Sequence, residues 1–149
     1  MQSRVLIVDD EPDIRELLEL TLDRMSLQTS SAADVRSARQ QLGNERFDLC
    51  LTDLRLPDGD GLELVELIQQ RYNQMPVAVI TAHGSTETAI RAMKSGAFDF
   101  VSKPVDLRKL RDLVDSAIQL ARHGVSGTSA IEPLEDDSSP GITGNSEKI

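Results

Sequence analysis

The sequence is poor in aromatic residues and contains a single cysteine. Among 149 residues there is no Trp, and Phe and Tyr together make up 3% of the chain. A nucleic-acid surface built from stacked aromatic side chains is therefore not expected. One cysteine cannot form an internal disulfide framework or a zinc site made of several cysteines. Because Cys50 stands between two leucines, we expect a buried, unreactive thiol.

Basic residues are also scarce. The chain has 16 Lys and Arg against 25 Asp and Glu, which gives a formal net charge of −9. Partners such as nucleic acid or an anionic membrane call for a basic patch, so this balance argues against them. The first apolar run, 5–8, is followed at once by acids, which excludes a signal peptide or a transmembrane helix there. We expect a soluble cytoplasmic protein.

The composition changes near residue 124. Residues 124–149 hold four Gly, five Ser, two Pro and no aromatic residue, with five acids against one Lys. Such a segment buries too little apolar area to offset the entropy lost on ordering. We predict one domain over 1–123 and a flexible acidic linker over 124–149.

Residues 1–123 alternate between two hydrophobic periods. Short apolar runs predict strands, and apolar residues three and four apart predict amphipathic helices between them. The expected strands are 4–8, 27–30, 47–52, 76–80 and 98–102, and the expected helices cover about 14–25, 33–42, 62–72, 85–96 and 106–121. Apolar strands alternating with helices indicate an α/β fold, in which a parallel sheet has helices on both faces. We predict a doubly wound five-stranded parallel sheet in the order 2-1-3-4-5.

Polar residues stand where four of these strands end. Asp9 and Asp10 follow the first strand, Asp53 the third, Thr81 the fourth and Lys103 the fifth. Each alone has an ordinary explanation, such as a turn, a helix cap or a solvated side chain. Together they meet at one edge of the sheet, where three carboxylates repel one another unless a cation lies among them. Hard oxygen ligands suit Mg²⁺, and an ammonium with a hydroxyl suits phosphoryl oxygens.

Asp53 is the best candidate nucleophile of the set. It ends the central strand, and we expect the loop after it, 54–61, to be flexible because it contains Pro57, Gly59 and Gly61. Attack of a carboxylate on phosphorus gives an aspartyl phosphate.

Four motifs carry a resemblance to a known family. IVDDEPDIRELL (7–18), LTDLRLPDGDG (51–61), VITAHG (79–84) and GAFDFVSKP (96–104) resemble the receiver domains of two-component response regulators. The resemblance implies a flavodoxin- or CheY-like (βα)5 fold and a sensor histidine kinase that phosphorylates Asp53. It implies a regulatory module, whose only chemistry is Mg²⁺-assisted self-phosphorylation and autodephosphorylation, rather than an enzyme.

The resemblance also implies roles for the other site residues. Mg²⁺ would be held by Asp10, Asp53 and the backbone carbonyl of Arg55, with Asp9 acting through water. Thr81 and Lys103 would bind the phosphoryl oxygens, and the peptide bond before Pro104 would be cis.

One position departs from the pattern of the family. Many receivers carry Tyr where this chain has Phe100. A phenyl ring can turn inward when Thr81 moves, but it cannot make a hydroxyl contact. The family also tends to form homodimers through the fourth helix, fifth strand and fifth helix, where this chain carries Arg108, Lys109 and Arg111.

The segments 47–65 and 96–114 look like receivers of NtrC-type activators. The end of the chain, GITGNSEKI (141–149), is similar to the opening of the sigma-54-activating AAA+ ATPase module of that group. We therefore expect a receiver with its linker, followed in the natural chain by an ATPase domain of the same polypeptide.

Three alternatives stay open from the residues alone. A Mg²⁺-dependent phosphatase with an aspartyl-phosphate intermediate would need a second Asp two residues after Asp53, where this chain has Arg55. A receiver-like binding module that is never phosphorylated would not need the full set of acids, Thr81 and Lys103. A stand-alone receiver is opposed by the linker and its final motif.

Overall fold

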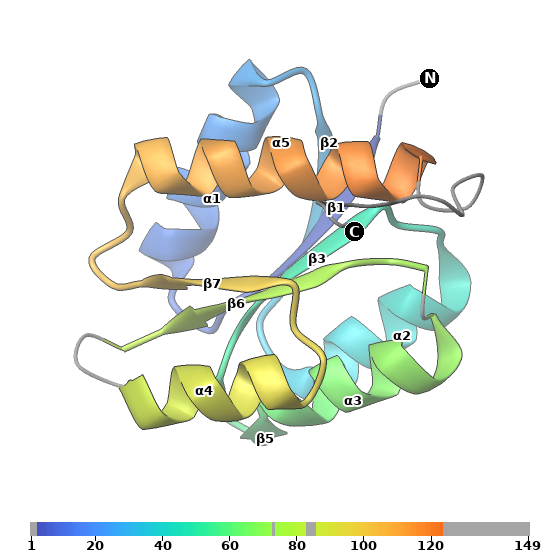
Figure 1. The fold of residues 1–149 in the computed structure, drawn as a ribbon, viewed down its shortest axis with the longest axis vertical. Coiled ribbons are helices and arrows are strands. Elements are labelled where there is room, and N and C mark those ends of the chain that lie inside the picture. Colours follow the sequence, from blue (N-terminus) through green and yellow to red (C-terminus); the bar gives the residue numbers. More distant parts are fainter. Residues whose placement is uncertain (1–2, 73, 83–85, 124–149) are drawn as a thin grey trace, which may run out of the picture.

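The chain forms a central parallel sheet with helices on both faces (Figure 1). The computed structural model describes residues 3–72, 74–82 and 86–123. The sheet strands are β1 (Arg4–Val8), β2 (Gln28–Ala32), β3 (Leu49–Asp53), β6 (Val77–Thr81) and β7 (Asp99–Ser102), and a small hairpin pairs β4 (Arg55–Leu56) with β5 (Gly59–Asp60). The helices are α1 (Pro12–Arg24), α2 (Val35–Asn44), α3 (Gly61–Arg71), α4 (Thr86–Lys94) and α5 (Leu107–His123).

The sheet order is β2-β1-β3-β6-β7 with every pair parallel. Since β4 and β5 lie outside this sheet, the order among the five sheet strands is 2-1-3-4-5. The predicted topology is therefore confirmed, and the carboxyl ends of β1, β3, β6 and β7 meet at one edge.

Each face of the sheet has its own hydrophobic core. Along β1, Val5 and Ile7 pack with α1 and α5, whereas Leu6 and Val8 pack with α2 and α3. This alternation is the period-two geometry of a strand covered on both sides. Figure 1 shows α1 and α5 on one side of the sheet and α2, α3 and α4 on the other. Cys50 is fully buried, and burial raises the pKa of its thiol to about 12, as expected of an unreactive cysteine.

Local capping explains where the helices begin. Pro12 opens α1, where its missing N–H costs no hydrogen bond. Asp60 and Glu63 form a capping box at α3, and the side chain of Asp106 accepts from the first amides of α5. The sequence predicts that α2 ends at residue 42, just before Gly43. The helix continues to Asn44, because the Glu45 amide still donates to the carbonyl of Gln41.

The loop after β3 differs from its prediction. We expected a flexible segment over 54–61, but these residues form the β4–β5 hairpin. Leu54 and Leu56 are buried in the core between the sheet and α2 and α3. The glycines and proline of this loop therefore form a tight turn, which Leu54 and Leu56 anchor to the core.

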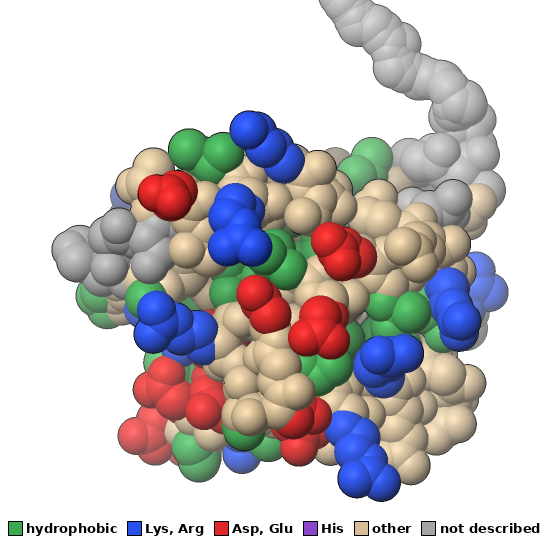
Figure 2. Space-filling view, turned by 90° about the horizontal axis from the view of Figure 1, so that it is seen from below, with side chains coloured by type: hydrophobic (Ala, Val, Ile, Leu, Met, Phe, Trp, Pro, Cys, Tyr) green, Lys and Arg blue, Asp and Glu red, His purple; other side chains and the backbone are tan. Residues whose placement is uncertain are grey.

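On the face in Figure 2, some acidic side chains lie near the centre and others gather at the lower left, with basic side chains distributed among and around them. None of the helices in the described part of the chain has the length and apolar character needed to cross a bilayer. The predicted linker, 124–149, lies outside the described residues.

Candidate functional site

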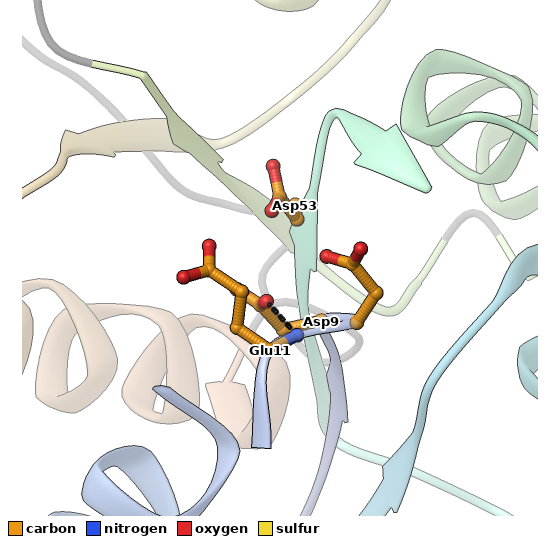
Figure 3. A group of neighbouring side chains, drawn as sticks. Asp9, Glu11 and Asp53 are labelled. Atoms are coloured by element: carbon orange, nitrogen blue, oxygen red, sulfur yellow. Dashed lines mark hydrogen bonds between the residues drawn. The ribbon is translucent and has the colours of Figure 1, made fainter. Parts of the chain in front are cut away.

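Acidic side chains gather at the carboxyl edge of the sheet. Oxygen atoms from Asp9, Asp10, Glu11 and Asp53 all lie within 4.8 Å of one another. Figure 3 shows Asp9 and Glu11, just after β1, facing Asp53 at the end of β3. The sequence prediction that the strand-end acids converge is borne out in this geometry, and Glu11 joins them.

Lys103 supplies the positive charge of this cluster. Its Nζ lies 2.9 Å from Oδ2 of Asp53, 2.7 Å from Oε2 of Glu11 and 3.4 Å from Oδ2 of Asp9. Burial alone would lower the pKa of Lys103, but hydrogen bonds to Glu11 and Asp53 and the attraction of Asp53 and Asp9 raise it above its usual range. The ammonium therefore stays charged at neutral pH.

Asp9 is the most buried acid of the site. Its side chain has no exposed surface, and Oδ1 accepts the Glu11 amide at 2.9 Å. Burial raises the pKa of Asp9 despite this hydrogen bond, and the neighbouring Asp53 charge raises it further. Oδ2 makes no hydrogen bond among the described residues, although Nζ of Lys103 lies 3.4 Å from it. A buried carboxylate oxygen without a hydrogen bond is costly, so this atom favours a further cation or a water molecule beside it.

The site therefore fits a hard divalent cation. It offers several carboxylate oxygens within one coordination sphere, including a buried one that makes no hydrogen bond among the described residues. Exposed Asp10 and Glu11 leave the outer side open for water, which Mg²⁺ retains in most protein sites. Lys103 contributes only one positive charge to four acids, so the cluster keeps a net negative charge.

Thr81 and Lys103 reach the same cleft as Asp53. A cleft of about 340 Å³ is lined by Asp10, Glu11, Asp53, Leu54, Arg55, Thr81, Ala82, Thr88 and Lys103. The Lys103 amide donates to the carbonyl of Thr81 at 2.8 Å, which ties the ends of β6 and β7 together. The Arg55 amide donates to Oδ1 of Asp53 at 3.2 Å. The Lys103–Pro104 peptide bond is cis.

Phe100 lies outside this cleft. It is half-buried on β7, and Nζ of Lys109 on α5 lies 4.7 Å from the centre of its ring. This distance is in the range of a cation–π contact. The ring packs against the hydrophobic core on the side of α2, α3 and α4, and the ammonium of Lys109 reaches it from α5.

Sequence reasoning missed Glu11, which contacts Lys103 as closely as Asp53 does. The only signal was its place as the third consecutive acid after β1. It also missed Arg15, whose Nη1 donates to the carbonyl of Asp9 at 2.7 Å from the first turns of α1. Both contacts depend on the position of the start of α1 relative to the end of β1, which the sequence pattern does not predict.

Asp58 connects the loop of the site to α2. Its two carboxylate oxygens accept the amides of Val35 at 2.8 Å and Arg36 at 3.0 Å. These bonds lower the pKa of Asp58. The β4–β5 hairpin is therefore fastened to the start of a helix more than 20 residues earlier in the chain, where the helix dipole favours a negative charge.

Gly61 lets the chain pass close to the end of β3. A Cβ at this position would overlap the carbonyl oxygen of Asp53 and lie 2.9 Å from Cα of Leu54. The Gly61 amide donates to the Leu54 carbonyl at 2.9 Å. Only glycine fits this approach without moving the backbone beside Asp53.

The chain matches a family model. The model described as the response regulator receiver domain covers residues 5–115. The chain is 65% identical to the response regulator protein PilR of Pseudomonas aeruginosa over 119 residues, 80% of this chain and 27% of that protein. It is 34% identical to the transcriptional regulator NtrC of Proteus hauseri over 117 residues, 78% of this chain and 25% of that protein. The chain thus spans about a quarter of the length of these relatives.

Solved structures agree with these relatives. NtrX from Brucella abortus superposes with a TM-score of 0.80 at 32% identity, covering 86% of this chain and 29% of that one. The beryllofluoride-activated NtrC4 receiver domain dimer gives a TM-score of 0.75 at 32% identity, covering 79% of this chain and 98% of that one. The predicted similarity to the receivers of NtrC-type activators is confirmed, and the chain is also similar to PilR over most of its length.

Proposed function

Because the chain belongs to the response regulator receiver domain family, we propose that Asp53 accepts a phosphoryl group from a sensor histidine kinase. A carboxylate oxygen of Asp53 attacks the phosphorus of the kinase phosphohistidine. The P–N bond breaks, its electron pair stays on the imidazole nitrogen, and an acyl phosphate remains on Asp53. The observation that carries this proposal is the ammonium of Lys103 bound to Asp53 in a cleft that also contains Thr81.

The neighbouring residues prepare the cleft for a phosphoryl group. Lys103 and the hydroxyl of Thr81 would donate to phosphoryl oxygens, since both line the cleft around Asp53. Asp10, Asp53 and the backbone carbonyl of Arg55 would hold Mg²⁺, with Asp9 acting through water. When bound, Mg²⁺ supplies charge that stabilises the phosphoryl oxygens. Self-phosphorylation from small phosphodonors and hydrolysis of the acyl phosphate would use the same residues.

Phosphorylation would act on the α4–β7–α5 face. Thr81 ends β6, which pairs with β7, and Phe100 on β7 packs beneath Lys109. A shift of Thr81 toward the phosphoryl group would bias the position of this edge and its aromatic ring. Exposed apolar side chains, Ile90 and Met93 on α4 and Leu107 on α5, support a homodimer through this face. A related solved structure is an activated receiver domain dimer.

Phosphorylation of the receiver domain would control transcription. We propose that 1–123 form the receiver domain and that 124–149 link it to a sigma-54-activating AAA+ ATPase in the natural polypeptide. The relatives PilR and NtrC are much longer than this chain, which leaves room for such a domain. The likeness to PilR favours type IV pilus genes as the targets and the cytoplasm as the place of action.

Transfer from a phosphorylated sensor kinase tests the proposal. The wild-type chain should take up labelled phosphate in the presence of Mg²⁺, and Asp53→Asn should not. Asp23→Asn, an exposed acid on α1, serves as the matched control and should behave as the wild type. Label on Asp53→Asn, or continuous turnover of a small phosphate ester by the wild type, would refute the proposal.

A further inference from the structure

A groove lies at the edge of the sheet opposite Asp53. It has a volume of about 500 Å³ and lies where α2 and α3 end, beside the last turns of α5 and the residues that lead into β3 and β6. Its apolar lining consists of Leu42, Phe47, Tyr72, Met75 and Ala121. The phosphoryl chemistry at the other edge does not use this groove.

The charges around the groove favour an acidic ligand. Its two acids are both engaged by Arg4, whose guanidinium pairs with Glu45 and whose amide donates to Asp48 at 2.9 Å. Arg46 and Arg71 also line the groove and are exposed. Neither makes an ion pair with any residue that the structure describes. The groove thus presents two uncompensated guanidinium groups beside an apolar floor.

The chain itself contains a segment of complementary character. Residues 131–137 read Ile-Glu-Pro-Leu-Glu-Asp-Asp, which places two branched apolar side chains among four acids. Ala121 of α5 lines the groove, and α5 ends at His123, eight residues before Ile131. At roughly 3.3 Å per residue, a tether of this length reaches about 26 Å. The segment can therefore turn back onto a groove that begins at the end of α5.

We propose that the acidic segment 131–137 of the same chain docks in this groove. Ile131 and Leu134 would lie on the apolar lining, and the carboxylates would lie beside Arg46 and Arg71. Because the segment is tethered to α5, docking is intramolecular and needs little intrinsic affinity. The docked segment fixes the direction in which the chain leaves the receiver domain. It thereby sets where the following part of the polypeptide lies relative to α5.

The groove contains its own optical probe. Tyr72 is the only tyrosine of the chain, which has no tryptophan. Tyrosine emission of the whole 149-residue chain therefore reports on this groove, and acrylamide, a neutral quencher, measures access to the ring. We expect the quenching constant to rise about twofold in Ile131→Asp/Leu134→Asp, because the ring loses the cover of the segment. Added salt should raise quenching of the wild type, since it screens the exposed charges.

Two further variants make the experiment specific. Arg46→Glu/Arg71→Glu should raise quenching as the first double variant does, with an unchanged far-ultraviolet circular dichroism spectrum. Val125→Asp/Ile142→Asp adds the same charge outside the segment and should leave quenching at the wild-type value. Equal quenching in the wild type and in Ile131→Asp/Leu134→Asp would overturn the proposal. The proposal would also be overturned if dilution of the wild type raised the quenching of Tyr72 to the level of the variants. The segment that covers the ring would then come from a second copy of the chain.

Discussion

Nζ of Lys103 lies 2.9 Å from Oδ2 of Asp53, so an ammonium at the acidic edge contacts the carboxylate that ends the central strand. The same nitrogen contacts Glu11 and lies near Asp9. Lys103 thus occupies the position from which it can meet a phosphoryl group on Asp53. Until then it partly compensates the charge of the cluster.

Removal of this ammonium should destabilise the metal-free protein. In Lys103→Met the aliphatic stem remains, but buried Asp9 and nearby Asp53 lose their cation. We expect a loss of about 1–3 kcal/mol in the free energy of unfolding, measured with urea in the presence of a chelator. Mg²⁺ should recover most of the loss, since a bound cation replaces the missing charge. Lys94→Met, at an exposed site on α4, should match the wild type in both conditions. A loss that Mg²⁺ leaves unchanged would contradict this account.

Asp9 should make the metal-free protein less stable as the pH rises. Burial raises the pKa of Asp9 above its ordinary value of 3.8, so the folded state holds this proton more tightly than the unfolded state. Stability is therefore lost from about pH 4 upward, until Asp9 is ionised in both states. Asp9→Asn has no carboxyl to ionise at this position and so lacks this loss of stability. The free energy of unfolding of the variant, relative to that of the wild type, should therefore increase with pH. The variant should also gain less stability from Mg²⁺. Parallel urea titrations across pH 4–8 measure both effects, and a pH-independent difference would exclude the explanation.

Asp58 should make the protein less stable as the pH falls, which is the opposite of the effect of Asp9. Hydrogen bonds from the amides of Val35 and Arg36 lower its pKa below 3.8, so the ionised form is the one that stabilises the fold. This contribution is present above pH 4 and disappears as the pH falls through the lowered pKa. Asp58→Ala should therefore unfold at a lower temperature than the wild type at pH 7, with the difference shrinking toward pH 2. Asp58→Asn, which keeps one acceptor oxygen, should lie between the two. A difference that stays constant with pH would assign the effect to packing.

Gly61 should tolerate no side chain. In Gly61→Ala the new Cβ overlaps the carbonyl oxygen of Asp53, so the backbone beside the site must move. We expect a loss of about 2 kcal/mol in stability and slower phosphorylation of Asp53. Gly43→Ala is the matched control, because a Cβ there meets no atom within 4 Å. Since Gly43 lies in α2, that variant should gain up to about 1 kcal/mol. If Gly61→Ala were as stable as the wild type and were phosphorylated at the same rate, the backbone beside Asp53 could accommodate a Cβ at little cost, which would contradict this prediction.

The sequence is sufficient to predict the sheet order and the edge that holds the site. Both follow from local patterns, namely apolar strands with polar residues at their ends. The contacts it does not reveal are tertiary. Asp58 bonds to amides 22 and 23 residues away, and Gly61 is constrained by the backbone of Asp53 and Leu54. The β4–β5 hairpin was missed for the same reason, since it depends on the burial of Leu54 and Leu56 in the core.

The most direct test of the account locates the phosphoryl group on the chain. The protein is incubated with acetyl phosphate and Mg²⁺ and then treated with borohydride, which reduces an aspartyl phosphate to homoserine. Peptide mass spectrometry should find homoserine at position 53 of the wild type and at no acid of Asp53→Asn. Homoserine at position 9 or 10, 5-hydroxynorvaline (the product from a glutamyl phosphate) at position 11, or no homoserine at position 53 would contradict the claim that Asp53 is the phosphoacceptor.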